Sequence, residues 1–227
     1  MKIISADEAA LLIKDECTIA LSGSAATSLV ADRVLRAIEE RYLSAGTPKN
    51  LTVFHPQGMG DKDTQGMSRF AHKGMCKRVI GGHWGMSPAM GKLAVEEEVE
   101  AYNMPQGVMA QMVRAMAAKG PGVITKIGLD TYIDPRQSGG KMNESAKEDL
   151  IEVMTIDGEE WLRYKPISFD VAIIRGTTAD EDGYISFEEE VHYDEAVSMA
   201  AAAKNSGGIV IVQVKRMANA IHWSAQR

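Results

Sequence analysis

Four glycine-containing segments combine residue types that can bind or transform a small ligand. They are SGSAATS at 22–28, HPQGMGDKD at 55–63, GGHWGMSP at 81–88 and NMPQGV at 103–108. Glycine lets a ligand approach the backbone, while hydroxyl, imidazole and amide groups exchange hydrogen bonds with ligand oxygens. Together the segments are typical of a glycine-lined crevice, but they do not name a reaction.

The first segment joins an apolar run to a helical pattern, so the backbone amides at Gly23 and Ser24 are candidates to hold a carboxylate or phosphate at a helix N-terminus. It has neither the GxGxxG spacing of a dinucleotide site nor the Gly-Lys-Ser/Thr of a P-loop. A simple tight turn capped by Ser24 or Thr27 is the structural alternative.

The other candidates are a strand end and a helix start. In Gly81–Gly85 (GGHWG), His83 and Trp84 either line a pocket or are satisfied structural side chains, with Gly82 and Gly85 giving the backbone room. Gln106 falls in the first turn of a helix, where its neutral amide can donate to a ligand oxygen or stay solvated. No G-x-S-x-G elbow is present, so a hydrolase triad is not predicted.

Two acidic runs, 95–100 and 187–195, could supply a catalytic carboxylate, although such runs are usually solvated faces. The sequence at 180–183 resembles a cation loop only loosely, and a plain turn is preferred. Cys17 and Cys76 lack a Cys-x-x-Cys spacing, so no metal site is predicted.

The elements that must position these segments alternate between apolar strands and amphipathic helices. Strands are expected at 17–23, 51–56, 77–84 and 99–104, with helices at 5–15, 27–43, 69–74, 87–98 and 105–120. Strands separated by helices form a parallel sheet covered on both faces, and ligands bind beyond its carboxyl ends.

The second half adds a polar loop at 137–145 and a β-hairpin near 149–165, with Asp157 and Gly158 at its turn. A strand near 170–175, a helix near 195–206 and a strand near 209–214 follow. The predicted fold is therefore one α/β domain: an open, mostly parallel sheet with helices on both faces and a hairpin insertion.

Composition sets limits on partners. The chain has 227 residues, with 25 Lys and Arg against 31 Asp and Glu, giving a net charge of −6. This balance argues against nucleic acid or an anionic membrane as partner. The sequence has neither an 18-residue apolar run nor a signal peptide pattern, so a cytoplasmic location is expected.

Several long motifs resemble the N-terminal half of the family I coenzyme A transferases. They are HPQGMGDKDTQGMSRFAHKGMCKRVIGGHWGMSPAM, EAYNMPQGVMAQMVRAMAA, TYIDPRQSGGKMNE, FDVAIIRGTTADEDGYISFEEE and GGIVIVQVKR. Within the family, they are most similar to the acetate/propionate (short-chain acyl) enzymes that carry both halves on one polypeptide. The resemblance assigns 1–216 to the family's alpha domain, whereas 217–227 departs from its pattern, as a truncation or an altered reading frame would cause.

The resemblance implies a ping-pong transfer through a glutamyl-CoA thioester, with coenzyme A as a substrate and no metal or redox cofactor. The family's nucleophilic Glu lies in the C-terminal half, so the resemblance implies no catalytic residue in this chain. It places Gln106 in the acyl site and Gly23 and Ser24 in a glycine-rich loop beside it. Gly81–Gly85 is implied to be pocket-forming. The loop SGSAATS has one glycine, fewer than is usual in the family.

Two further functions are compatible with the same sequence. One is a catalytically inactive domain that binds a carboxylate or acyl-CoA on the same scaffold. The other, a sugar-phosphate isomerase, is less favoured because no basic cluster gathers at the strand ends. As half of an enzyme, the chain is expected to bind acyl-CoA, small carboxylates and a C-terminal (beta) half, and to form a homo-oligomer through an exposed apolar face.

Overall fold

A six-stranded parallel sheet lies at the centre of the computed structural model, which describes residues 1–24 and 26–218. The strand order is β11-β8-β1-β2-β3-β4. The bounds are β1 (Thr18–Leu21), β2 (Leu51–His55), β3 (Cys76–Gly81), β4 (Glu100–Asn103), β8 (Val171–Arg175) and β11 (Ile209–Gln213). Most residues of the four central strands are buried, whereas the edge strand β11 is only partly covered, and the predicted open parallel sheet is confirmed.

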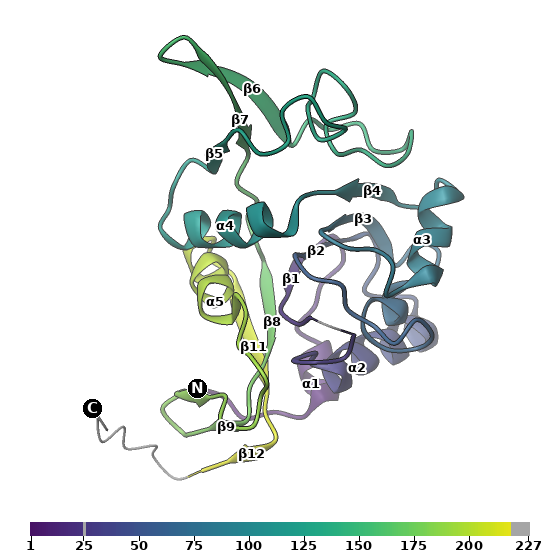
Figure 1. Ribbon diagram of the computed structural model, residues 1–227. Helices are drawn as coiled ribbons and strands as arrows, with labels where there is room; N and C mark the ends of the chain where they lie inside the picture. The colour runs from purple at the N-terminus through teal and green to yellow at the C-terminus, as the bar shows by residue number, and fades with distance from the viewer. Residues whose placement is uncertain (25, 219–227) are drawn as a thin grey trace, which may run out of the picture.

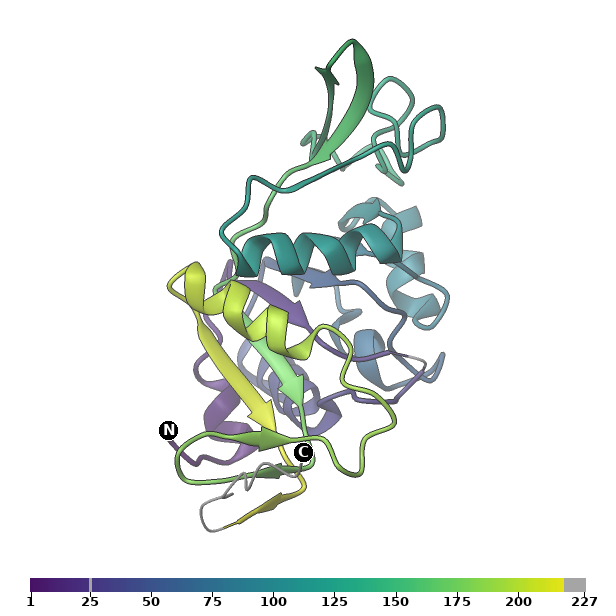
Figure 2. The same cartoon turned by 60° about the vertical axis from the view of Figure 1, so that its left-hand side comes forward.

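Helices cover both faces, as expected. One face carries α1 (Ala6–Ala10), α2 (Asp32–Ala45), the 3-10 helix η1 (Gly66–Phe70) and α3 (Pro88–Val95). The other carries α4 (Gln106–Ala117) and α5 (Ala196–Asn205), which lie side by side in Figures 1 and 2. Alternate residues of each strand enter the two cores: Ile19 and Leu21 face α2, whereas Ala20 faces the opposite side.

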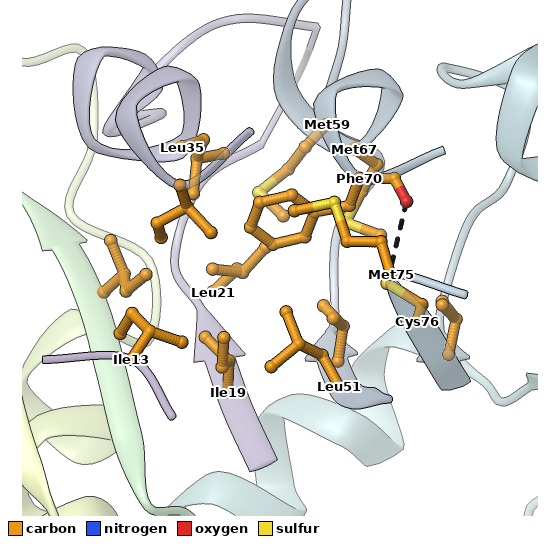
Figure 3. Close-up of a cluster of buried hydrophobic side chains, with 14 of the residues drawn as sticks. Ile13, Ile19, Leu21, Leu35, Leu51, Met59, Met67, Phe70, Met75 and Cys76 are labelled. Carbon is orange, nitrogen blue, oxygen red and sulfur yellow. Dashed lines mark hydrogen bonds between the residues drawn. The ribbon is translucent and has the colours of Figure 1, made fainter. Parts of the chain in front are cut away.

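Figure 3 shows the first core, where strand residues such as Ile19 and Leu51 meet Leu35 of α2 and Phe70 of η1. The thiol of Cys76 donates to the Phe70 carbonyl at 3.7 Å. Burial raises the pKa of this thiol to about 12, so it stays protonated and serves as a core side chain.

Two smaller sheets flank the main one. The predicted hairpin is confirmed as β6 (Ile151–Ile156) and β7 (Glu159–Tyr164). A third strand, β5 (Val123–Thr125), pairs with β7, and the small sheet projects beyond α4 (Figure 1). The other small sheet contains β9 (Thr178–Ala179), β10 (Ile185–Ser186) and β12 (Arg216–Met217). From residue 219 on, the predicted tail 217–227 lies outside the described residues.

The helix expected from residue 27 begins only at Asp32, so that boundary was wrong. Ala26 and Leu29 have φ of 73° and 54°, and the Ser24 N–H donates to the Ser28 carbonyl at 3.0 Å. These left-handed residues fold the segment into a turn of its own before the helix starts. Gly23 and Ser24 therefore lie outside the helix N-terminus that was expected to hold an anion.

Helix α1 is also shorter than expected, ending at Ala10, although its Ser5–Glu8 capping box is present. Ser87 caps α3 and Pro88 follows it, as predicted. No helix in the described ranges is both long and apolar enough to cross a membrane.

The polar loop that carries SGGKMN covers the outer edge of β4. The Asn103 N–H donates to the Gly140 carbonyl at 2.8 Å, and the Ala101 N–H donates to Asn143 Oδ1 at 3.2 Å. The Asn143 amide donates in turn to the carbonyls of Ala94 and Val99, both at 2.8 Å. An edge strand with free N–H groups can pair with a strand of another molecule, and this loop prevents such pairing by occupying those groups.

Candidate functional site

The four glycine-containing segments meet at the carboxyl edge of the main sheet. The loop after β1 joins the loop after β2 through the Gly60 N–H, which donates to the Ala26 carbonyl at 2.6 Å. The loop after β3 joins both of its neighbours: the Gly82 N–H donates to the His55 carbonyl at 3.1 Å, and the Gly81 carbonyl accepts from the Met104 N–H at 3.1 Å. The edge predicted for ligand binding is thus one continuous surface.

Gly82 and Gln106, both predicted site residues, are in contact. A Cβ on Gly82 would lie 2.0 Å from the Pro56 carbonyl oxygen and 2.7 Å from Cγ of Gln106. Only glycine lets the side-chain stem of Gln106 and the Pro56 carbonyl approach the backbone this closely.

Gln106 begins α4, and Pro105 before it makes no side-chain cap. The residue is half-buried, and no group in residues 1–24 or 26–218 hydrogen-bonds its side-chain amide. The amide therefore has both donors available to a ligand oxygen at the positive end of the helix.

His83 and Trp84 point to different surroundings. The Trp84 indole N–H donates to the Tyr102 carbonyl at 3.2 Å, and its ring meets the His55 ring edge-on. The His83 side chain is exposed and lies over two glycines: a Cβ on Gly58 would come within 2.6 Å of its Nδ1, and one on Gly85 within 3.0 Å of its Cε1. His83 is thus open to a ligand, whereas the Trp84 donor is already occupied.

His55, the first residue of the 55–63 segment, was not singled out in the sequence. It is buried at the end of β2, with Nδ1 2.9 Å from the Gln57 carbonyl. The Nδ1–H tautomer therefore donates within its own loop. Burial, with a smaller effect from His83, lowers the pKa of His55 to about 4, which keeps the imidazole neutral at pH 7.

This lowered pKa predicts acid sensitivity. An unfolded histidine binds a proton below about pH 6.5, whereas folded His55 binds one only below about 4. The free energy of unfolding should hold above pH 6.5 and fall between pH 6.5 and 4, by about 3 kcal/mol in all. Urea unfolding at pH 7 and 4.5 should show the native chain losing about 2 kcal/mol more than His55→Gln. Equal losses in the two proteins would contradict the assignment.

Gly23 and Ser24 line the loop after β1. Gly23 has φ of 148°, and a Cβ there would lie 3.0 Å from both Met59 Sδ and Val30 Cγ2. Ser24 Oγ lies 3.2 Å from Nε2 of His192, which comes from the segment before α5. This meeting point lies beyond β1 and β8, neighbouring strands whose connections run over opposite faces of the sheet, where ligands commonly bind.

The acidic runs form ion pairs. In the second run, Glu189 contacts Lys215 and Arg216, both at 2.6 Å, and Glu190 contacts Arg175 at 3.0 Å. In the first, Glu98 contacts Lys73 at 2.8 Å. These carboxylates are therefore engaged in surface ion pairs, whereas Asp194, near the end of the second run, lies beside His192.

The loosely cation-like stretch at 180–183 folds as a turn, in which Asp180 Oδ1 accepts the N–H groups of Asp182 and Tyr184. In residues 1–24 and 26–218, no three His, Cys, Asp or Glu side chains gather as a metal site would require.

A shallow hollow beneath His83 is closed by side chains and leaves no space for a water molecule. Its lining is mostly methionine and aromatic: His55, Met59, Met67, His83, Trp84, Ser87 and Met90.

The sequence matches the family model described as Coenzyme A transferase over residues 3–225. The match includes residues 217–225, most of the tail that was expected to depart from the family pattern. Acetate CoA-transferase YdiF of Escherichia coli (strain K12) is 45% identical over 215 residues, covering 95% of this chain and 40% of that protein. Caffeate CoA-transferase of Acetobacterium woodii is 45% identical over 217 residues, covering 96% of this chain and 41% of that protein.

A crystal structure of acyl-CoA transferase (YdiF) apoenzyme from Escherichia coli O157:H7 has the same fold, with a TM-score of 0.94 and 44% identity. The similarity covers 97% of this chain and 43% of that one. The chain thus spans about two-fifths of the length of the curated relatives it matches.

Proposed function

The chain belongs to the coenzyme A transferase family, and from this premise we propose that it is the half bearing Gln106 of a short-chain acyl-CoA:carboxylate CoA-transferase. The family recognised from the sequence motifs is confirmed by the match over residues 3–225. The reaction, the second half and the substrates are the proposed part.

In the proposed reaction, a glutamate from the C-terminal half attacks the acyl-CoA thioester. The carbon–sulfur bond breaks, giving an acyl-glutamyl anhydride and the CoA thiolate. The thiolate then attacks the glutamyl carbonyl, which releases the first carboxylate and leaves a glutamyl-CoA thioester. An incoming carboxylate reverses these two steps, so that no proton, electron or water is consumed.

The observation that carries the proposal is the unpartnered amide of Gln106. It lies at the positive end of α4, against Gly82, with no described group bonded to it. A donor fixed there can bind a carboxylate oxygen or the oxygen of a thioester carbonyl as negative charge develops. Because it is neutral, it does so without placing a salt bridge in the site.

The need for a second half is supported by the surface beside the site. Val191, Tyr193 and Val197 flank His192 and are 88%, 63% and 69% exposed. Acyl transfer requires exclusion of water, and the hollow lined by His83 and Met90 has no room even for a water molecule. A C-terminal half packed on these apolar side chains would close the site, while a homo-oligomer through an apolar face stays a prediction.

The choice of a short acyl chain comes from the motif resemblance. The acetate and caffeate enzymes are equally similar to this chain, at 45% identity, although their names specify carboxylates of very different size. Discriminating one methylene costs only about 1–3 kcal/mol and depends on pocket shape. Competition between acetate and larger carboxylates would rank the substrates.

Reconstitution tests the proposal. The chain should be mixed with a separately produced remainder of E. coli YdiF, the part not matched here, and CoA exchange between acetyl-CoA and propionate measured by chromatography. We expect exchange from the mixture and none from either part alone. A stable complex without exchange would contradict the proposal, and acyl-CoA binding by that complex would favour the inactive binding domain.

A further inference from the structure

A serine, a histidine and an aspartate meet where the loop after β1 touches the segment before α5. Ser24 Oγ lies 3.2 Å from His192 Nε2, and His192 Nδ1 lies 3.2 Å from Asp194 Oδ2. Ser24 and His192 are 168 positions apart in the chain. The fold therefore brings together a serine, a histidine and an aspartate as in a catalytic triad, although the G-x-S-x-G motif of the α/β-hydrolases is absent from the sequence.

The cluster is largely shielded from solvent. Ser24 is 7% exposed, and the side chains of His192 and Asp194 are 29% and 16% exposed. The facing atoms, Nδ1 and Oδ2, are buried and close, but neither forms a hydrogen bond with any described group, so the carboxylate acts on the imidazole through its charge. Asp194 has φ of 39°, a backbone conformation that aspartate tolerates better than most residues.

A further carboxylate lies beside this cluster, and Arg114 of α4 is within electrostatic range of that carboxylate. Glu195 follows Asp194, and burial and that neighbouring carboxylate raise the pKa of Glu195. Arg114 of α4 acts on Glu195 in the opposite sense. His192 thus has the Ser24 hydroxyl at Nε2 and the Asp194 carboxylate at Nδ1, an arrangement in which an imidazole can act as a general base.

We propose that Ser24 is a nucleophile activated by His192 and Asp194, and that the cluster hydrolyses small acyl esters and thioesters. Neutral His192 takes the Ser24 hydroxyl proton as Oγ attacks the acyl carbon. The bond to the leaving sulfur or oxygen breaks, and the imidazolium returns the proton to the leaving group. Water, activated by the same histidine, then cleaves the acyl-serine ester, releasing the acid and restoring the hydroxyl.

This activity uses residues of this chain alone and does not depend on a glutamate in a second half. The two proposals can therefore fail separately. Loss of CoA exchange on reconstitution leaves the serine chemistry intact, and an unreactive Ser24 leaves the exchange reaction intact.

Labelling of the whole chain with phenylmethylsulfonyl fluoride tests the nucleophile, with p-nitrophenyl acetate hydrolysis as the second measurement. Peptide mass spectrometry should map the adduct to Ser24, and Ser24→Ala should carry none. His192→Gln should slow both reactions by about 10²-fold or more, because it removes the general base. Labelling of the native chain should also slow in acid, where the imidazolium cannot accept a proton.

Two matched variants serve as controls. Ser198→Ala removes a half-buried hydroxyl from the neighbouring helix α5. His72→Gln removes a histidine that contacts Glu39 at 2.9 Å without a serine beside it. Both should label and hydrolyse like the native chain.

An adduct on another residue, labelling no faster than in the urea-unfolded chain, or native rates in His192→Gln would each overturn the proposal. Circular dichroism verifies the fold of each variant. Should His192→Gln be misfolded, the acid dependence of labelling in the native chain decides: a rate that does not fall in acid rejects the general base.

Discussion

Replacing Gly82 with alanine should destabilise the protein by about 3 kcal/mol, at the upper end of what overpacking costs. The new methyl group would lie 2.0 Å from the Pro56 carbonyl oxygen, a backbone atom that cannot rotate away. To remove this clash, the loops after β2 and β3 would have to move apart. That movement would break the hydrogen bond from the Gly82 N–H to the His55 carbonyl. Urea unfolding at pH 7 measures the loss.

Gly91→Ala is the control, because nothing lies within 4 Å of a Cβ built there. Gly91 is inside α3, where alanine favours the helix by about 0.5–1 kcal/mol, so this variant should be slightly stabilised. If Gly82→Ala behaves like Gly91→Ala, the close approach of the two loops is not required by the fold.

Replacing Gln106 with glutamate should lower kcat/KM of the reconstituted enzyme by about 10²–10³-fold, the range seen when one oxyanion donor is lost. The two side chains have the same shape, but an ionised carboxylate donates no hydrogen bond and repels a carboxylate substrate. Steady-state CoA exchange with acetyl-CoA and propionate measures the effect. Because an acidic residue is favourable in the first turn of a helix, the loss should come without a loss of stability.

Gln111→Glu makes the same chemical change on the exposed surface of α4 and should leave exchange unchanged. Native activity in Gln106→Glu would remove Gln106 from the acyl site. A drop shared equally by both variants would indicate a general effect of charge on the docking of the second half.

The main sheet and its covering helices were predictable because their signals are local. Buried parallel strands are short apolar runs, and helix starts such as Ser87-Pro88 carry their own capping groups. The sequence predicted that Gly82 and Gln106 lie at the same edge of the sheet, because parallel strands place their carboxyl ends together, but it did not predict their contact. Gln106 itself entered through the family resemblance as well as through its helix position.

What escaped prediction depends on partners distant in the chain. Leu29 and Val30 continue the apolar stripe of the predicted helix, but both are buried, and the chain takes a left-handed turn at Leu29 before the helix begins. No local sequence pattern indicates that Ser24 and His192 are close, because they are 168 positions apart and only the tertiary fold brings them together. The burial that keeps His55 neutral is likewise a property of packing.

The cover over β4 restricts how molecules of this protein can join their sheets. Because Asn143 and Gly140 already bond the outward N–H groups of Ala101 and Asn103, no strand from another molecule can pair with that side. Among the described strands, β11 lies at the opposite end of the main sheet and pairs only with β8. Within the main sheet, strand addition from another molecule, the first step toward β-aggregation, is therefore left to the β11 edge.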